Sequence, residues 1–121
     1  MLGRRWLGMT EEIDPADEDA VFAEATRLEM LSMLSEATLL LERLLSSPTP
    51  SRASRYHAEL WIATHGAPPE KAYLYGEILV RAQPDDLFAW YALSFAADRC
   101  GRTQEAVAAR ARAAEIEKNA R

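Results

Sequence analysis

Apolar residues recur every three or four positions along most of the chain, which is the period of an amphipathic α-helix. Between residues 30 and 45 they form two neighbouring rows, so this stretch is expected to be buried on more than one side. The rows consist of Met30, Met33, Ala37, Leu40 and Leu44 in one and Leu31, Leu34, Leu41 and Leu45 in the other. No run alternates between apolar and polar residues with period two, so the pattern predicts an all-α fold.

Turns that contain proline or glycine divide this pattern into five or six helices. Proline cannot continue the hydrogen-bond ladder of a helix, and glycine commonly ends one. Helical periodicity resumes near Arg52 and continues to Gly66. The expected turns are 46–51, 66–69, 83–86 and 101–102. Residues 15–46 form either one long helix or a hairpin, because no strong helix breaker stands at Ser32 or Ser35.

Capping residues indicate where the helices begin. Asp14 followed by Pro15 predicts an N-cap and a first helical position, and the acidic residues that follow suit the positive end of the helix dipole. The later helices are expected to begin at their own prolines or caps, namely Pro69, Asp85 or Asp86, and Thr103.

The chain also repeats itself with a period of about 34 residues. The copies cover about 18–51, 53–86 and 87–120 and align Ala37, Ala72 and Ala106, which are 35 and 34 residues apart. Helix–turn–helix units of this period resemble tetratricopeptide repeats. The third copy resembles that family best, through Trp90, Leu93, Gly101, Ala106 and Ala113. The sequence departs from the family at Gly76 and Arg110, where a bulky apolar residue is usual.

The resemblance implies an α-solenoid of about three helical hairpins. We expect it to occupy residues 14–121 as one domain, preceded by a loosely attached or disordered arm at 1–13. Ala72 and Ala106 should be buried where helices approach closely, because that place in the repeat admits only a small side chain.

In this family the first helix of each hairpin lines a concave, partner-binding groove. The resemblance places that groove at Phe22, Thr26, Glu29, His57, Trp61, Thr64, Phe88, Tyr91, Phe95, Asp98 and Arg99. Five of these residues are aromatic, and the alternative is that some of them pack between helices. Family members that clamp acidic C-terminal tails use lysine and asparagine at positions where this chain has Phe22, Thr26, Phe88 and Ala92, which argues against such a clamp.

Composition narrows the range of partners. The net charge of -5 and the pI near 5.0 argue against nucleic acid or an anionic membrane surface. No apolar run approaches the length of a membrane span. Cys100 is the only cysteine, so no intrachain disulfide can form, and we expect a cytoplasmic protein.

The sequence offers no convincing catalytic or metal-binding motif. His57 and His65 are eight residues apart and have no third ligand nearby, and no glycine-rich phosphate loop or nucleophile–base set can be picked out. We therefore predict a non-enzymatic protein without a metal or cofactor.

The predicted function is to bind a partner polypeptide, either an amphipathic helix or an apolar segment, in the aromatic groove. Within this class the protein is a general scaffold or a small chaperone, because three degenerate repeats in an acidic chain also resemble the bacterial needle-subunit chaperones of type III secretion. The alternative is a structural homo-oligomer that binds no foreign peptide. Its subunits would associate through the acidic region 9–51, of net charge -8, and the basic region 99–121, of net charge +3.

Overall fold

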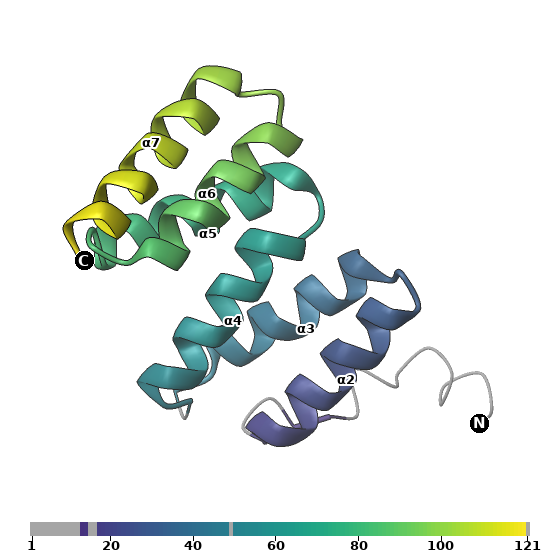
Figure 1. Ribbon diagram of the computed structural model, residues 1–121. Coiled ribbons are helices and arrows are strands. Elements are labelled where there is room, and N and C mark those ends of the chain that lie inside the picture. Colours follow the sequence, from purple (N-terminus) through teal and green to yellow (C-terminus); the bar gives the residue numbers. More distant parts are fainter. Residues whose placement is uncertain (1–12, 15–16, 49, 121) are drawn as a thin grey trace. The chain divides into compact units, whose positions relative to one another are not determined.

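The computed structural model describes residues 13–14, 17–48 and 50–120, and over these residues it contains six helices and no strand (Figure 1). The helices are α2 (Glu18–Met30), α3 (Leu34–Ser46), α4 (Arg52–His65), α5 (Pro69–Ala82), α6 (Leu87–Arg99) and α7 (Thr103–Asn119). The all-α class and the four turns predicted from the sequence are confirmed. Apart from Ile13, the predicted N-terminal arm lies outside the described residues.

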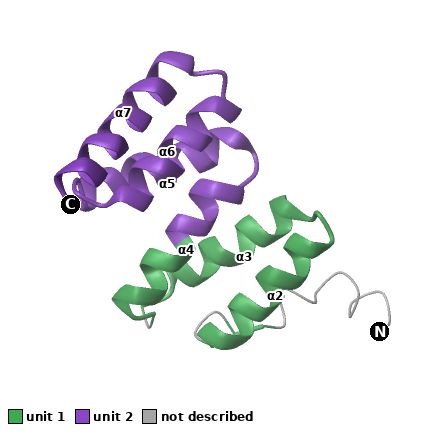
Figure 2. Cartoon of the chain, viewed as in Figure 1, with its two compact units in different colours: residues 1–58 green, residues 59–121 purple. Residues whose placement is uncertain are grey.

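The chain consists of two compact units, residues 1–58 and residues 59–121, and the boundary between them falls within α4 (Figure 2). Unit 1 contains α2, α3 and the first half of α4. Unit 2 contains the second half of α4 together with α5, α6 and α7.

Residues 15–46 form a hairpin rather than one long helix. Ser32 adopts a left-handed backbone conformation, with φ of 59°, just after the end of α2. The amide of Met33 then donates to the carbonyl of Leu28 at 2.8 Å, and the amide of Ser32 donates to that of Glu29 at 2.9 Å. These two bonds form a Schellman motif, which satisfies the last carbonyls of α2 and turns the chain into α3.

The same motif ends α6, at the aligned place in the third copy of the repeat. Gly101 has a φ of 74°, its amide donates to the carbonyl of Asp98 at 3.0 Å, and the amide of Arg102 donates to that of Ala97 at 2.8 Å. Glycine reaches this conformation without a steric cost, whereas serine does not. The sequence therefore predicts the turn at Gly101 from the glycine itself. It indicates the turn at Ser32 only through the alignment of Ser32 with Gly101.

Two of the predicted helix caps are wrong. The N-cap of α2 is Asp17, whose carboxylate accepts a hydrogen bond from the amide of Ala20 at 3.1 Å, so the helix begins three residues beyond the predicted start at Pro15. Thr103 is the first residue of α7 and makes no cap, since the N-cap position is occupied by Arg102 without a side-chain bond. The other predictions hold, because α5 begins at Pro69 and Asp86 caps α6 through the amide of Phe88.

In unit 1, the first turn of α4 is tied to both preceding helices. The carboxylate of Glu18 on α2 accepts hydrogen bonds from the amide of Ser51, at 2.8 Å, and from the hydroxyl of Ser54. Arg55 donates to the carbonyl oxygens of Leu45, at 3.0 Å, and Ser47, at 2.8 Å, at the end of α3. Side chains from α2 and α4 thus pair with polar backbone groups that are left unpaired where α3 ends and α4 begins.

The core of unit 1 lies between α2 and α3. Its buried hydrophobic side chains are Val21, Ala25 and Leu28 from α2 and Ala37, Leu40, Leu41 and Leu44 from α3, and Ala58 of α4 is buried as well. The apolar side of α2 is therefore covered within the unit. Glu24 is also buried there, with 7% of its surface exposed, and it is paired with Arg27 on the same helix.

In unit 2, α6 packs against both α5 and α7. A Cβ atom added to Gly76 of α5 would lie 3.0 Å from Cδ1 and 3.1 Å from Cα of Leu93 on α6, so the two helices nearly touch there. This explains why a glycine replaces the expected bulky residue. The alanines Ala72 and Ala106 are each 0% exposed, as predicted. Trp90 lies against the preceding turn, where its Nε1 donates to the carbonyl of Pro84 at 2.7 Å.

Enlarging Ala106 should therefore destabilise the protein. Ala106→Leu overpacks a closed site, which typically costs about 1–3 kcal/mol, so we expect the melting temperature to fall by about 4–12 °C. Ala108→Leu, at an exposed position of the same helix, is the matched control and should change it little. Thermal unfolding followed by circular dichroism measures both; equal melting temperatures would contradict this packing.

The contacts of Glu18 predict a pH-dependent contribution to stability. Hydrogen bonds from Ser54 and Ser51 lower the pKa of the Glu18 carboxyl below its usual value of 4.5. A lowered pKa in the folded state means that the stabilisation is complete above pH 4.5 and is lost as the pH falls through the lowered pKa. Glu18→Gln should thus unfold at lower denaturant concentration than the native protein at pH 7, and the difference should shrink in acid. Ser54→Ala should behave similarly, and a difference independent of pH would contradict this role.

Candidate functional site

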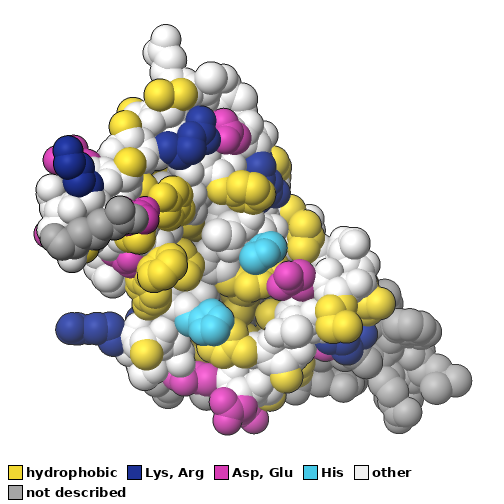
Figure 3. Space-filling model, in the orientation of Figure 1, with side chains coloured by type: hydrophobic (Ala, Val, Ile, Leu, Met, Phe, Trp, Pro, Cys, Tyr) yellow, Lys and Arg dark blue, Asp and Glu magenta, His cyan; other side chains and the backbone are white. Residues whose placement is uncertain are grey.

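The outer side of α6 carries three exposed aromatic residues. Phe88, Tyr91 and Phe95 are 65%, 42% and 53% exposed, and their spacing of three and four residues places them on one side of the helix. We call these three residues the α6 aromatic face. Hydrophobic side chains over this part of unit 2 are visible in Figure 3. More than half of each phenylalanine is exposed, so neither fills the space between the helices of the repeat.

The opposite side of α6 explains this arrangement. It consists mostly of small residues that are buried against α5 and α7, namely Ala89, Ala92, Ala96 and Ala97, together with Leu93. Where helices pack this closely there is no room for a phenyl ring. Phe88, Tyr91 and Phe95 therefore point outward, and about 300 Å² of their aromatic surface meets solvent, taking about 200 Å² for a whole aromatic side chain.

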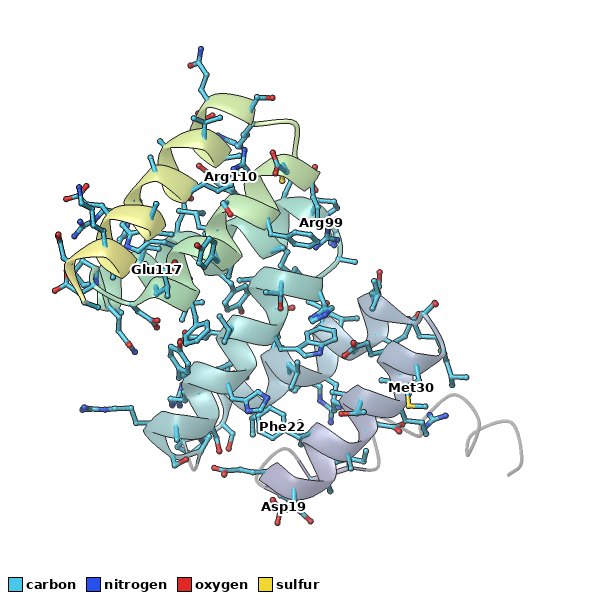
Figure 4. All side chains as sticks on the ribbon, viewed as in Figure 1. Asp19, Phe22, Met30, Arg99, Arg110 and Glu117 are labelled. Carbon is cyan, nitrogen blue, oxygen red and sulfur yellow. The ribbon has the colours of Figure 1, made fainter. Side chains whose placement is uncertain are left out.

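On one flank, α7 runs antiparallel to α6 and supplies charged side chains. The hydroxyl of Tyr91 donates to Oε2 of Glu117 at 3.3 Å, and Arg110 donates to Oδ2 of Asp98 at 2.7 Å. In Figure 4, Glu117 lies toward the N-terminal end of α6 and Arg110 toward its C-terminal end. Asp98, one of the predicted groove residues, is thus half of a surface ion pair.

On the other flank lies the C-terminal end of α4. Arg99 donates to the carbonyl oxygens of Gly66, at 2.8 Å, and Thr64, at 3.5 Å, so this predicted groove residue caps the end of α4 (Figure 4). The hydroxyl of Thr64 donates to the carbonyl groups of its own helix. Trp61 is half-buried, and its ring lies 5.2 Å from that of the exposed His65. The contacts of Arg99 place the last turns of α4 and α6 beside each other.

The remaining predicted groove residues belong to unit 1. The rings of Phe22 on α2 and His57 on α4 are 4.7 Å apart, with Phe22 half-buried and His57 exposed. Thr26 is exposed, but its hydroxyl donates to the carbonyl of Phe22 at 2.9 Å, and Glu29 is half-buried. The structure therefore brings Phe22 and His57 together in unit 1. In unit 2 it brings Arg99 to the carbonyl of Thr64, while Trp61 lies against His65 of its own helix.

Sequence reasoning missed an exposed apolar group at the turn between α2 and α3. Met30, Leu31 and Met33 are 80%, 55% and 39% exposed, although their periodicity predicted that they are buried. The prediction is wrong for these three because the hairpin turn interrupts the helix at Ser32 and breaks the register of both rows. Leu39 of α3 and Leu74 and Ile78 of α5 are also exposed.

Among the described residues, no group of three or more His, Cys, Asp or Glu side chains is placed to hold a metal ion. Burial raises the pKa of the Cys100 thiol, which disfavours its nucleophilic thiolate form. None of the helices in the described part of the chain is long and apolar enough to cross a membrane.

Comparison of the chain with models of protein families, with curated proteins and with solved structures finds no match.

Two predicted site residues of α6, Arg99 and Phe88, should affect the stability of the protein differently when each is replaced by alanine. Arg99→Ala removes charge-assisted hydrogen bonds to two carbonyl groups, each worth about 1.5–3 kcal/mol when buried and less at this half-buried position, so the melting temperature should fall by several degrees. Phe88→Ala lies on the exposed face and should change stability by no more than about 0.5 kcal/mol. Thermal unfolding of both variants tests this. A larger fall in melting temperature for Phe88→Ala than for Arg99→Ala would contradict the assignment of Arg99 to the fold and of Phe88 to the exposed face.

Proposed function

We propose that this protein is a small solenoid of three helical hairpins of the tetratricopeptide type, and that it binds a partner polypeptide through an exposed aromatic surface. The observation that carries the proposal is the α6 aromatic face. Exposure of three aromatic side chains to water on one side of a helix is unfavourable, and a contact with another molecule would remove that cost. Aromatic residues also dominate the binding energy of protein interfaces.

Two features support the repeat. Helices α2 and α6 end in the same Schellman motif, with Ser32 and Gly101 in the left-handed conformation at aligned positions. The three aligned alanines, Ala37, Ala72 and Ala106, are each 0% exposed. A shared turn geometry and a shared small buried residue are what repeated helical hairpins require, because both set how closely one helix can approach the next.

An amphipathic helix or a short apolar segment suits the α6 aromatic face best. Phe88 and Phe95 are separated by about two turns, or roughly 10 Å, so a helix laid along them would contact them with apolar residues about seven positions apart. Trp61 on α4 adds a partly exposed aromatic ring in the same unit. In this proposal the protein acts as a scaffold or a small chaperone in the cytoplasm.

The alternative, end-to-end stacking of subunits, has less support. It draws on the apolar stripe of α2, yet Val21, Ala25 and Leu28 of that stripe are buried. The charge difference between the two ends of the sequence remains, but solvated charges alone contribute little to a stable contact.

The binding proposal predicts that Trp61→Ala and Tyr91→Ala each weaken partner binding at least about tenfold, which corresponds to ~1.4 kcal/mol. Aromatic side chains of this size commonly contribute about 2 kcal/mol or more at the centre of an interface. The partner is first identified by a pull-down from the native host with mass spectrometry, and its purified form is then titrated by calorimetry.

Both variants should keep the helical circular dichroism of the native protein. Leu74→Ala is the control, because Leu74 is 53% exposed on α5, outside the aromatic face. Loss of folding in either aromatic variant would assign that residue to the core. Normal binding by both folded variants would mean that the partner contacts another surface.

A further inference from the structure

The turn between α2 and α3 exposes two methionine side chains. Met30, the last residue of α2, is 80% exposed, and Met33, which follows the turn, is 39% exposed. The side chain of Met30 projects from the end of its helix (Figure 4). Leu31 between them is exposed as well, and all three residues belong to unit 1. The turn therefore presents an apolar surface whose thioethers are accessible to small oxidants in the solvent.

We propose that Met30 is a modification site for peroxides, and that its oxidation makes the surface of this turn polar without unfolding the protein. The thioether sulfur attacks the peroxide, so an S–O bond forms and the O–O bond breaks. The transferred oxygen passes its proton to the leaving oxygen, which departs as water or an alcohol. The sulfur loses two electrons to the peroxide and becomes a sulfoxide, which is polar where the thioether was apolar.

Accessibility selects Met30 among the sulfur atoms of the described residues. A thioether reacts without first losing a proton, so its rate of oxidation follows its exposure to solvent. Met30 is about twice as exposed as Met33. The remaining described sulfur belongs to Cys100, which is half-buried, and burial raises the pKa of its thiol and so disfavours the thiolate that peroxides oxidise. Met30 is therefore the thioether that a peroxide reaches most easily.

The fold tolerates a sulfoxide at Met30. The turn is closed by backbone hydrogen bonds from the amides of Ser32 and Met33, in which no thioether takes part. Most of the Met30 side chain already meets water, so the new oxygen is hydrated there and no polar group is buried. Oxidation at this residue therefore changes the surface of unit 1 and leaves its core intact.

Met33 should respond differently to the same reaction. It directly follows the left-handed residue of the Schellman motif, and a side chain at this position commonly packs against the residue at the place of Leu28. More than half of the Met33 side chain is covered. A sulfoxide there would have to be buried or the turn would have to open, and either outcome costs stability. Oxidation of Met30 thus alters the surface, whereas oxidation of Met33 weakens the turn.

Treatment of the purified full-length chain with hydrogen peroxide, followed by mass spectrometry, tests the order of oxidation. Met30 and Met33 lie in one tryptic peptide, residues 28–43, so fragment ions locate the added oxygen, and the other methionines of the chain fall in different peptides. We expect Met30 to oxidise at least about twofold faster than Met33, in proportion to their exposed fractions. Methionine sulfoxide reductases specific for the two epimers should restore the native mass. Equal rates, or faster oxidation of Met33, overturn the inference.

A matched pair of variants tests the consequence for surface and fold. Glutamine is polar and similar in length to methionine, so Met30→Gln imitates the sulfoxide. It should elute earlier than the native protein in hydrophobic interaction chromatography and change the melting temperature by no more than about 3 °C. Met33→Gln should lower the melting temperature by about 4 °C or more, because its side chain is partly covered. A Met30→Gln variant that elutes with the native protein, or that melts as low as Met33→Gln, contradicts the proposal.

This inference does not rest on the proposed function. All its measurements use the protein alone, and the turn belongs to unit 1, whereas Trp61 and Tyr91 belong to unit 2. Failure of these tests removes the modification site and leaves the partner-binding test with Trp61→Ala and Tyr91→Ala as it stands.

Discussion

The close approach of helices in unit 2 is the constraint on which the candidate site depends. Gly76 lets α5 come within van der Waals contact of Leu93 on α6. Buried alanines on α6 and α7 likewise allow these two helices to pack closely. Packing at this density leaves no interior space for large rings. Phe88, Tyr91 and Phe95 consequently lie on the outer side of α6, so the same constraint that stabilises the unit also creates an exposed aromatic surface.

In both units, charged side chains connect one helix to the backbone at the end of another. In unit 1, Glu18 and Arg55 reach from one helix to the polar backbone groups at the end of another. In unit 2, Arg99 does the same for the end of α4. Each of these contacts satisfies a carbonyl or amide group that the helix itself cannot pair. A charged residue that appears available for binding in the sequence can thus be fully engaged in holding the fold.

This distinction separates the predicted site residues. The family resemblance selected Phe88, Tyr91 and Phe95 by their place in the repeat, and they are exposed on one side of α6. It selected Arg99 and Asp98 by the same rule, but Arg99 caps α4 and Asp98 is paired with Arg110. A repeat pattern specifies which way a side chain points. It carries no information on whether a polar side chain finds a partner nearby.

The sequence by itself determined the helical class, the position of nearly every turn and the burial of the aligned alanines, because periodicity, proline, glycine and small residues act locally. Only the tertiary structure decided the hairpin at Ser32, since a serine enters the left-handed conformation when the packing of α2 against α3 compensates its cost. The exposure of Met30 and Met33 follows from that turn. Gly76 departs from the repeat pattern, and only its contact with Leu93 on the next helix explains why a glycine stands there.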